Sequence, residues 1–177
     1  GLFLDEDAVA RCERLPKKVV RNKNFCDVLS RPKVQGWHLE HLTRGCIVAP
    51  IGEAESGWQK VALADGREGY VMAGILDTYY TEPSSDEEDT LRQQLVDAAM
   101  LYQGTHYRWG GKSPMGIDCS GLCSMAYMLC GILIYRDANI EEGFPMHSIE
   151  LKDVQPGDLL FYGRSGVSGV GHVAIYI

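Results

Sequence analysis

A short acidic segment divides this chain of 177 residues into two halves with different patterns. From Thr81 to Thr90 the sequence is polar, contains a proline and carries five acidic side chains but no apolar run, which is typical of a linker that leads into a helix. Short alternating runs typical of β-strands precede this segment, and apolar residues at helical spacing follow it. We therefore expect an α+β protein of two domains joined by an acidic linker at residues 81–90.

The first half shows β-like runs separated by turn sequences between residues 24 and 80. The runs and turns are Gly45 to Pro50, Glu55-Ser56-Gly57, Trp58 to Leu63, Asp65-Gly66 and Gly69 to Ala73. An Asp-Gly pair between alternating runs is a strong signal for a β-hairpin. Together with Gly57-Trp58, Val61 and Gly69-Tyr70-Val71, the pattern resembles the bacterial SH3 domain. This resemblance implies a small SH3-like β-barrel over residues 24–80, while residues 1–23 stay unassigned.

A helix is expected directly after the linker, from about residue 86 to residue 103. Ser85 and Glu88 have the spacing of a capping box, in which two side chains satisfy backbone N–H groups at a helix N-terminus. Apolar residues then recur at helical spacing up to Gly104: Leu91, Leu95, Ala98 and Tyr102. This helix leads the chain towards Tyr107.

A second helix is expected from Cys119 to Gly131, a glycine suited to ending a helix. Cys119 lies in its first turn, where unpaired backbone N–H groups favour an anion. Because a thiolate rather than a thiol attacks carbonyl groups, this position suits a nucleophile. His172, at the start of a strand-like run to Ile177, is the candidate base, and it must approach Cys119 through the fold.

The alternative for Cys119 is a small buried residue, which is the ordinary role of a lone cysteine. Leu122, Cys123, Ala126 and Cys130 recur at helical spacing, so we expect Cys123 and Cys130 to face the core. Cys119 differs because small and polar residues surround it where the helix begins. Spacing by itself leaves both interpretations open.

Four motifs in the second half resemble the NlpC family of papain-like cysteine peptidases. They occur in the same order along the chain: Tyr107-Arg108-Trp109-Gly110-Gly111, Ile117-Asp118-Cys119-Ser120-Gly121, Pro156-Gly157-Asp158-Leu159 and Gly171-His172-Val173. The resemblance covers residues 90–177 and implies a papain-like peptidase domain, which we place at 91–177. It implies that Cys119 is the nucleophile and His172 the base. It also implies that Tyr107 donates to the oxyanion, beside the backbone N–H of Cys119.

The resemblance further implies a third catalytic residue, a His, Asn or Gln that orients the base from the strand after the Gly-His strand. The sequence stops at Ile177, before such a strand. We therefore expect the peptidase domain to be incomplete at its C-terminus, because a bare apolar strand would leave an exposed edge. If Ile177 is the true terminus, a catalytically impaired wall-binding or regulatory protein is the alternative.

The substrate implied by the resemblance is a bacterial cell-wall peptide, cut at its γ-D-glutamyl-L-diamino acid bond. In members that act on released peptides, the acidic residue of an Arg-Asp-Ala or Arg-Asp-Ser segment binds the free amine of an N-terminal L-alanine. That residue is Asp137 here, and an ordinary turn carboxylate is its equal alternative. Asp118 and Ser120 are further candidates for contact with the peptide. A lytic endopeptidase on intact peptidoglycan and a lipid-directed acyltransferase of the same superfamily are the alternative activities.

Composition and charge argue against other classes of function. The formal net charge is −7, whereas nucleic-acid binding favours a basic face, and no run approaches the ~20 apolar residues of a membrane span. The histidines outside the Gly-His motif lack metal-ligand spacing, so we expect no metal and no cofactor: His38, His41, His106 and His147. The expected partners are peptidoglycan-derived peptides. No secretion signal is visible, so both the bacterial cytoplasm and the cell envelope stay open, as does the oligomeric state.

Overall fold

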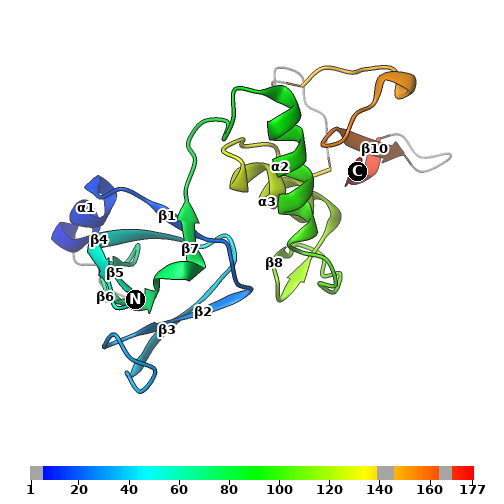
Figure 1. Ribbon diagram of the computed structural model, residues 1–177. Helices are drawn as coiled ribbons and strands as arrows, with labels where there is room; N and C mark the ends of the chain where they lie inside the picture. The colour runs from blue at the N-terminus through cyan, green and yellow to red at the C-terminus, as the bar shows by residue number, and fades with distance from the viewer. Residues whose placement is uncertain (1–5, 139–145, 164–168) are drawn as a thin grey trace. The chain divides into compact units, whose positions relative to one another are not determined.

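The computed structural model describes residues 6–138, 146–163 and 169–177. The chain divides into two compact units, Gly1–Tyr79 and Tyr80–Ile177 (Figure 1). This division falls directly before the expected linker at residues 81–90.

An antiparallel sheet makes up most of the first unit. Its strands are β1 (Lys18–Val20), β2 (Phe25–Leu29), β3 (His38–Thr43), β4 (Ile47–Glu55), β5 (Trp58–Ala62), β6 (Glu68–Met72) and β7 (Leu76–Thr78), with a 3₁₀ turn, η1 (Ala73–Ile75), before β7. They are arranged in the order β3-β2-β6-β5-β4-β1-β7. The three runs predicted from the sequence correspond to β4, β5 and β6, so those predictions are confirmed.

Turn chemistry explains the two central hairpins. Ser56 and Gly57 both have positive φ, at 50° and 81°, between β4 and β5, where a tight two-residue hairpin requires that conformation. Gly66, with φ 84°, turns the chain from β5 into β6, as the Asp65-Gly66 pair predicts. Valines that alternate along the strands then pack into one buried cluster, which includes Val28, Val48, Val61 and Val71.

Residues before 24 also take part in this unit, which the sequence did not predict. A helix, α1 (Glu6–Arg14), is followed by β1, which pairs with both β4 and β7. Cys12 is the one residue of the described part of α1 that packs into a buried cluster, together with Ala49 and Ala62. The description of the sheet as an SH3-like barrel stays a prediction.

The second unit contains two helices and short antiparallel strand pairs. Its elements are α2 (Glu88–Met100), β8 (Lys112–Ser113), β9 (Gly116–Ile117), α3 (Cys119–Leu129), the 3₁₀ turn η2 (Leu151–Asp153), β10 (Leu159–Gly163) and β11 (Val170–Ile175). Helix α3 packs against α2 on one side and against β11 on another. β8 pairs with β9, and β10 pairs with β11. None of the helices in the described ranges is long and apolar enough to cross a membrane.

The start of α2 differs from the capping box predicted from the sequence. The residue before the helix is Glu87 rather than Ser85, and Ser85 Oγ accepts a hydrogen bond from the Glu87 backbone N–H. The backbone N–H of Ser84 donates to the carbonyl of Cys130 at the end of α3. The backbone of Glu87 is extended, so the helix begins at Glu88, later than the expected residue 86.

Candidate active site

Helix α3 begins at a residue that caps it. Asp118 has an extended backbone, and its Oδ1 accepts a hydrogen bond of 2.7 Å from the backbone N–H of Gly121. Gly121 has no side chain for a steric reason, since a Cβ there would collide with the carbonyl oxygen of Gly111. At the other end, Gly131 adopts φ 81° directly after Cys130. The boundaries that the sequence predicts for this helix are therefore confirmed.

The three cysteines of this segment lie in different surroundings. Cys119, the first residue of α3, is partly exposed, whereas Cys123 and Cys130 are each 1% exposed. Burial, followed by the charge of Cys119, raises the pKa of the Cys123 thiol to about 12. Cys123 and Cys130 are therefore core residues, as predicted. Cys119 is the thiol of this helix that solvent can reach.

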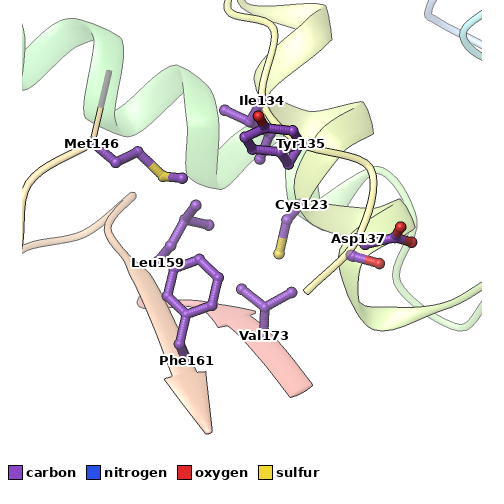
Figure 2. A pocket seen from close by; sticks show the side chains of 9 residues that line it. Cys123, Ile134, Tyr135, Asp137, Met146, Leu159, Phe161 and Val173 are labelled. Carbon is purple, nitrogen blue, oxygen red and sulfur yellow. The ribbon is translucent and has the colours of Figure 1, made fainter. Parts of the chain in front are cut away.

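A small pocket lies beside α3. Figure 2 shows Cys123 pointing into it from the helix, with Phe161 of β10 and Val173 of β11 nearby and Asp137 at one side. The remaining residues that line it are Ser120, Ile134, Tyr135, Met146 and Leu159. Asp137 is exposed and contributes the carboxylate among these lining residues. The assignment of Asp137 as an anchor for the substrate amine stays a prediction.

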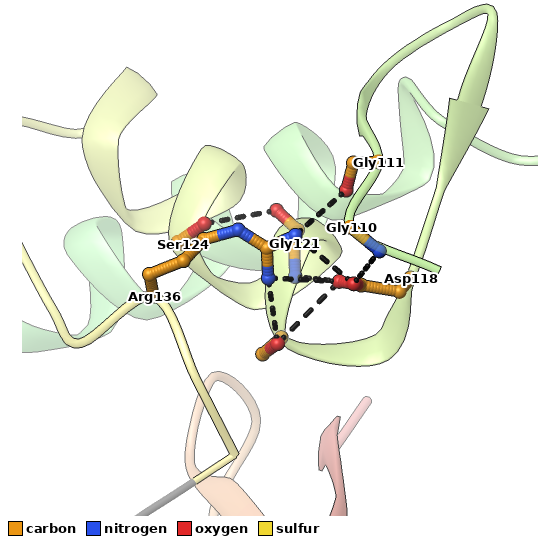
Figure 3. A network of polar contacts seen from close by, with 7 residues as sticks. Gly110, Gly111, Asp118, Gly121, Ser124 and Arg136 are labelled. Atoms are coloured by element: carbon orange, nitrogen blue, oxygen red, sulfur yellow. Dashed lines mark hydrogen bonds and ion pairs between the residues drawn. The ribbon is translucent and has the colours of Figure 1, made fainter. Parts of the chain in front are cut away.

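A network of polar contacts fixes the start of α3 (Figure 3). The guanidinium of Arg136 donates to Asp118 Oδ1 at 3.0 Å and to Asp118 Oδ2 at 2.9 Å, and also to Ser120 Oγ at 2.8 Å. Asp118 Oδ2 accepts a further hydrogen bond of 2.7 Å from the backbone N–H of Gly110. The network therefore joins three segments that are separate in sequence: the glycine turn, the helix start and the segment after α3.

The charge of Asp118 is stabilised by these contacts. Burial by itself raises the pKa of the carboxyl, but hydrogen bonds from Arg136 and from two backbone N–H groups outweigh burial and hold the pKa below its ordinary value. Asp118 and Ser120 are 7% and 6% exposed. Both side chains thus have partners within the protein, and the prediction that they also contact a peptide stays a prediction.

Backbone pairing places Tyr107 next to the segment that leads into α3. It forms an isolated parallel bridge with Ile117, two residues before Cys119. The backbone N–H of Arg108 donates to the Ile117 carbonyl, and that of Ile117 donates to the His106 carbonyl. The Tyr107 side chain is 67% exposed and Trp109 is 86% exposed. The motif therefore presents two large aromatic side chains to solvent.

His172 lies on β11, opposite Tyr162 of β10. The two rings are tilted by 41° with centroids 5.8 Å apart. Its neighbour Val173 is buried, and β11 packs against α3. The structure thus brings the strand of His172 against the helix of Cys119, although within the described ranges no hydrogen bond joins the two side chains. The assignment of Cys119, His172 and Tyr107 as catalytic residues stays a prediction.

The Pro-Gly-Asp motif has a structural role. Asp158 Oδ1 accepts a hydrogen bond of 2.7 Å from Arg92 of α2, and its Oδ2 accepts one from the Gln155 backbone N–H. Tyr127 of α3 donates from its hydroxyl to the Gly157 carbonyl at 2.6 Å. These contacts tie the turn before β10 to both helices. The motif therefore helps to hold the β10-β11 pair, whose strand β11 packs against α3.

Sequence reasoning missed the role of Arg136. The sequence drew attention to its segment only because of Asp137. Eighteen residues separate Arg136 from Asp118, so no local pattern connects them. The sequence shows only that an arginine precedes Asp137, and this does not indicate that Asp118 is its partner.

Residues 104–177 match the model of the NlpC/P60 family. The chain is 41% identical over 177 residues to dipeptidyl-peptidase 6 of Lysinibacillus sphaericus, covering 98% of this chain and 62% of that protein. It is 29% identical over 119 residues to γ-D-glutamyl-L-lysine dipeptidyl-peptidase of Bacillus cereus, covering 67% of this chain and 35% of that protein. The chain thus spans less than two thirds of the length of these curated relatives.

The crystal structure of an NlpC/P60 family protein from Bacillus cereus has a similar fold. The TM-score is 0.78 at 22% identity, and the likeness covers 97% of this chain and 55% of that chain. At this identity the likeness concerns the fold, and it extends over both units. The match to the NlpC/P60 family model lies within the second unit, over residues 104–177, and this part of the chain is therefore similar to that family.

Proposed function

We propose that this protein is a thiol hydrolase that cuts the γ-D-glutamyl-L-diamino acid bond of bacterial cell-wall peptides. The observation that carries the proposal is the position of Cys119, a partly exposed thiol at the start of a helix whose first turn is held by Asp118 and Arg136. The names of the two relatives, a dipeptidyl-peptidase and a γ-D-glutamyl-L-lysine dipeptidyl-peptidase, support the same chemistry. Their bacterial sources support a bacterial origin for this chain.

The proposed reaction begins when His172 accepts the proton of the Cys119 thiol. The thiolate attacks the carbonyl carbon of the γ-glutamyl amide, and the resulting oxyanion accepts hydrogen bonds from the Cys119 backbone N–H and the Tyr107 hydroxyl. The carbon–nitrogen bond then breaks, and the leaving amine takes the proton from His172. Water, deprotonated by His172, attacks the thioester, releases the new carboxylic acid and restores the thiol.

The proposed substrates are free peptides that begin with L-alanine. Asp137 is exposed and lines the pocket beside α3, where its carboxylate is available to pair with an ammonium group. Asp118, by contrast, already has Arg136 as its charged partner. This difference favours Asp137 as the residue that selects a free N-terminus. We propose in addition that residues 24–80 form an SH3-like domain.

A paired substrate assay tests the proposal. The full chain is incubated with an L-Ala-γ-D-Glu-diamino acid peptide and with its N-acetylated form, and the products are separated by mass. We expect cleavage of the free-amine peptide, a much lower rate on the acetylated one, and a higher KM for the free-amine peptide in Asp137→Asn. Equal turnover of the acetylated peptide or of intact peptidoglycan would instead indicate a lytic enzyme with an open cleft.

A control separates this chemistry from a contaminating activity. Cys119→Ser should remove cleavage, whereas Cys46→Ser, which changes a partly exposed cysteine of the first unit, should leave it intact. Activity that persists in Cys119→Ser would reject the nucleophile, and no cleavage of either peptide by the unmodified chain would reject the proposed substrate class.

A further inference from the structure

Three side chains that can bind a metal converge on the outer surface of the first unit. Asp27 comes from β2, and His38 and His41 come from β3. Asp27 Oδ1 lies 3.0 Å from His41 Nδ1 and 3.4 Å from His38 Nε2, and the three atoms all lie within 4.8 Å of one another. We propose that these residues form a binding site for a divalent transition-metal ion such as Zn²⁺.

Strand register places the carboxylate beside the first histidine. Asp27 and His41 are direct partners across the β2-β3 ladder. Directly opposite residues of an antiparallel pair project from the same face, with Cβ atoms about 5 Å apart. The two side chains therefore meet without any distortion of the backbone.

An irregularity in the ladder brings the second histidine to the same face. His38 and His41 are three positions apart, a spacing that puts side chains on opposite faces of a regular strand. Between Val28 and Leu29 the register shifts, so that Val28 is opposite Glu40 whereas Leu29 is opposite His38. Leu39 is the extra residue of this bulge on β3, and it restores His38 to the face of His41.

The distances from the Asp27 carboxylate to the two imidazoles match those of a tetrahedral zinc site. Zn–N and Zn–O bonds of about 2.0–2.1 Å at tetrahedral angles separate neighbouring ligand atoms by roughly 3.3 Å. The observed separations from Asp27 Oδ1, 3.0 and 3.4 Å, are close to this value. The three ligand atoms lie within 4.8 Å of one another, which is the neighbourhood that a single bound ion requires.

The donor set selects the class of metal. Two imidazoles and one carboxylate suit Zn²⁺ and its first-row neighbours, whereas Ca²⁺ and Mg²⁺ favour sites built from oxygen ligands. All three residues are exposed, so a fourth position stays open to water or to a ligand from another molecule.

The ring of His41 is already held in position. It stacks on Phe25, with centroids 5.4 Å apart and an interplanar angle of 29°, and it lies 6.4 Å from the ring of His38. When Nδ1 carries a proton, it can donate to Asp27. A bound ion takes the place of that proton between the two atoms, and the proton goes to the solvent.

Titration of the full chain with Zn²⁺ alone, in the presence of a non-coordinating phosphine reductant, tests the site. Asp27→Asn, His38→Ala and His41→Ala should each weaken binding at this site by at least about tenfold. His106→Ala, which removes an exposed histidine of the second unit, is the matched control and should leave the affinity unchanged. The Cys119→Ser background removes the exposed thiol of α3 as a competing ligand.

Imidazole nitrogen shifts supply a second readout that does not depend on activity. On addition of Zn²⁺, Nε2 of His38 and Nδ1 of His41 should shift, while the nitrogens of His106 should not. Thermal unfolding in chelator separates loss of a ligand from loss of the fold in each variant. Zinc affinity unchanged in all three variants, or binding abolished only by alkylation of the cysteines, would overturn the proposal.

Discussion

The guanidinium of Arg136 donates two parallel hydrogen bonds, of 3.0 and 2.9 Å, to the carboxylate of Asp118. Asp118 caps the helix that begins with Cys119, and Arg136 directly precedes Asp137, the candidate anchor for the substrate amine. One ion pair therefore links the proposed nucleophile to the proposed specificity residue. The planar guanidinium matches a carboxylate in a way that the single ammonium of lysine does not.

Arg136→Ala should lower the free energy of unfolding by about 1–3 kcal/mol, because the nearly buried Asp118 carboxylate loses its charged partner. Arg136→Lys should recover only part of that loss. Both variants should also lower kcat and slow alkylation of Cys119, since the helix start is no longer fixed. Arg31→Ala, in the exposed turn after β2, is the control. Urea unfolding and iodoacetamide kinetics measure the two effects, and stability equal to that of the control would contradict this role.

Iodoacetamide should label Cys119 before Cys123 near neutral pH. Burial raises the pKa of Cys123 to about 12 and also shields its sulfur, so little thiolate forms there and the reagent has little access. Peptide mass mapping over time measures the order of labelling. Faster modification of Cys123 than of Cys119 would show that the assignment of the reactive thiol is wrong.

His172→Ala should remove most of the hydrolysis, whereas Tyr107→Phe should leave a reduced remainder. The base acts in thiolate formation and again in protonation of the leaving amine, while loss of one oxyanion donor costs on the order of 10²–10³ in rate. Steady-state kcat/KM on the free-amine peptide measures both effects. Tyr162→Phe, across the ladder from His172, is a control for packing and should retain activity. If kcat/KM fell equally and only negligibly in His172→Ala and Tyr107→Phe, the proposed roles of both residues would be rejected.

Stability of the second unit should fall in acid because of Asp118 and Asp158. In both carboxyls burial raises the pKa, but the hydrogen bonds from Arg136 and Arg92 respectively outweigh it and leave the folded-state pKa below the ordinary value. Their contribution is therefore complete above the unfolded-state pKa of about 3.9 and is lost as pH falls through the lower folded-state pKa. Urea unfolding at a series of pH values from pH 6 to about pH 2 measures this loss of stability. Asp118→Asn and Asp158→Asn should each flatten the acid slope, whereas Glu53→Gln in the exposed part of β4 should not.

The sequence by itself determined the features that depend on neighbouring residues. The start of α3 at Asp118-Cys119 and its end at Gly131 follow from a capping carboxylate and a glycine with positive φ. The turn at Asp65-Gly66 follows from the same local chemistry. Helical spacing was enough to place Cys123 and Cys130 in the core, because burial of one helix face needs no knowledge of its partner.

Only the tertiary structure decided the features that depend on distant residues. The hydrogen bond from Ser84 to Cys130 joins the segment before α2 to the end of α3, and the ion pair between Arg136 and Asp118 joins residues eighteen positions apart. His38 and His41 lacked metal-ligand spacing in the sequence, yet the ladder with β2 and its bulge at Leu39 bring them together beside Asp27. Periodicity describes one element at a time, whereas register, bulges and ion pairs between elements are set when the elements pack against each other.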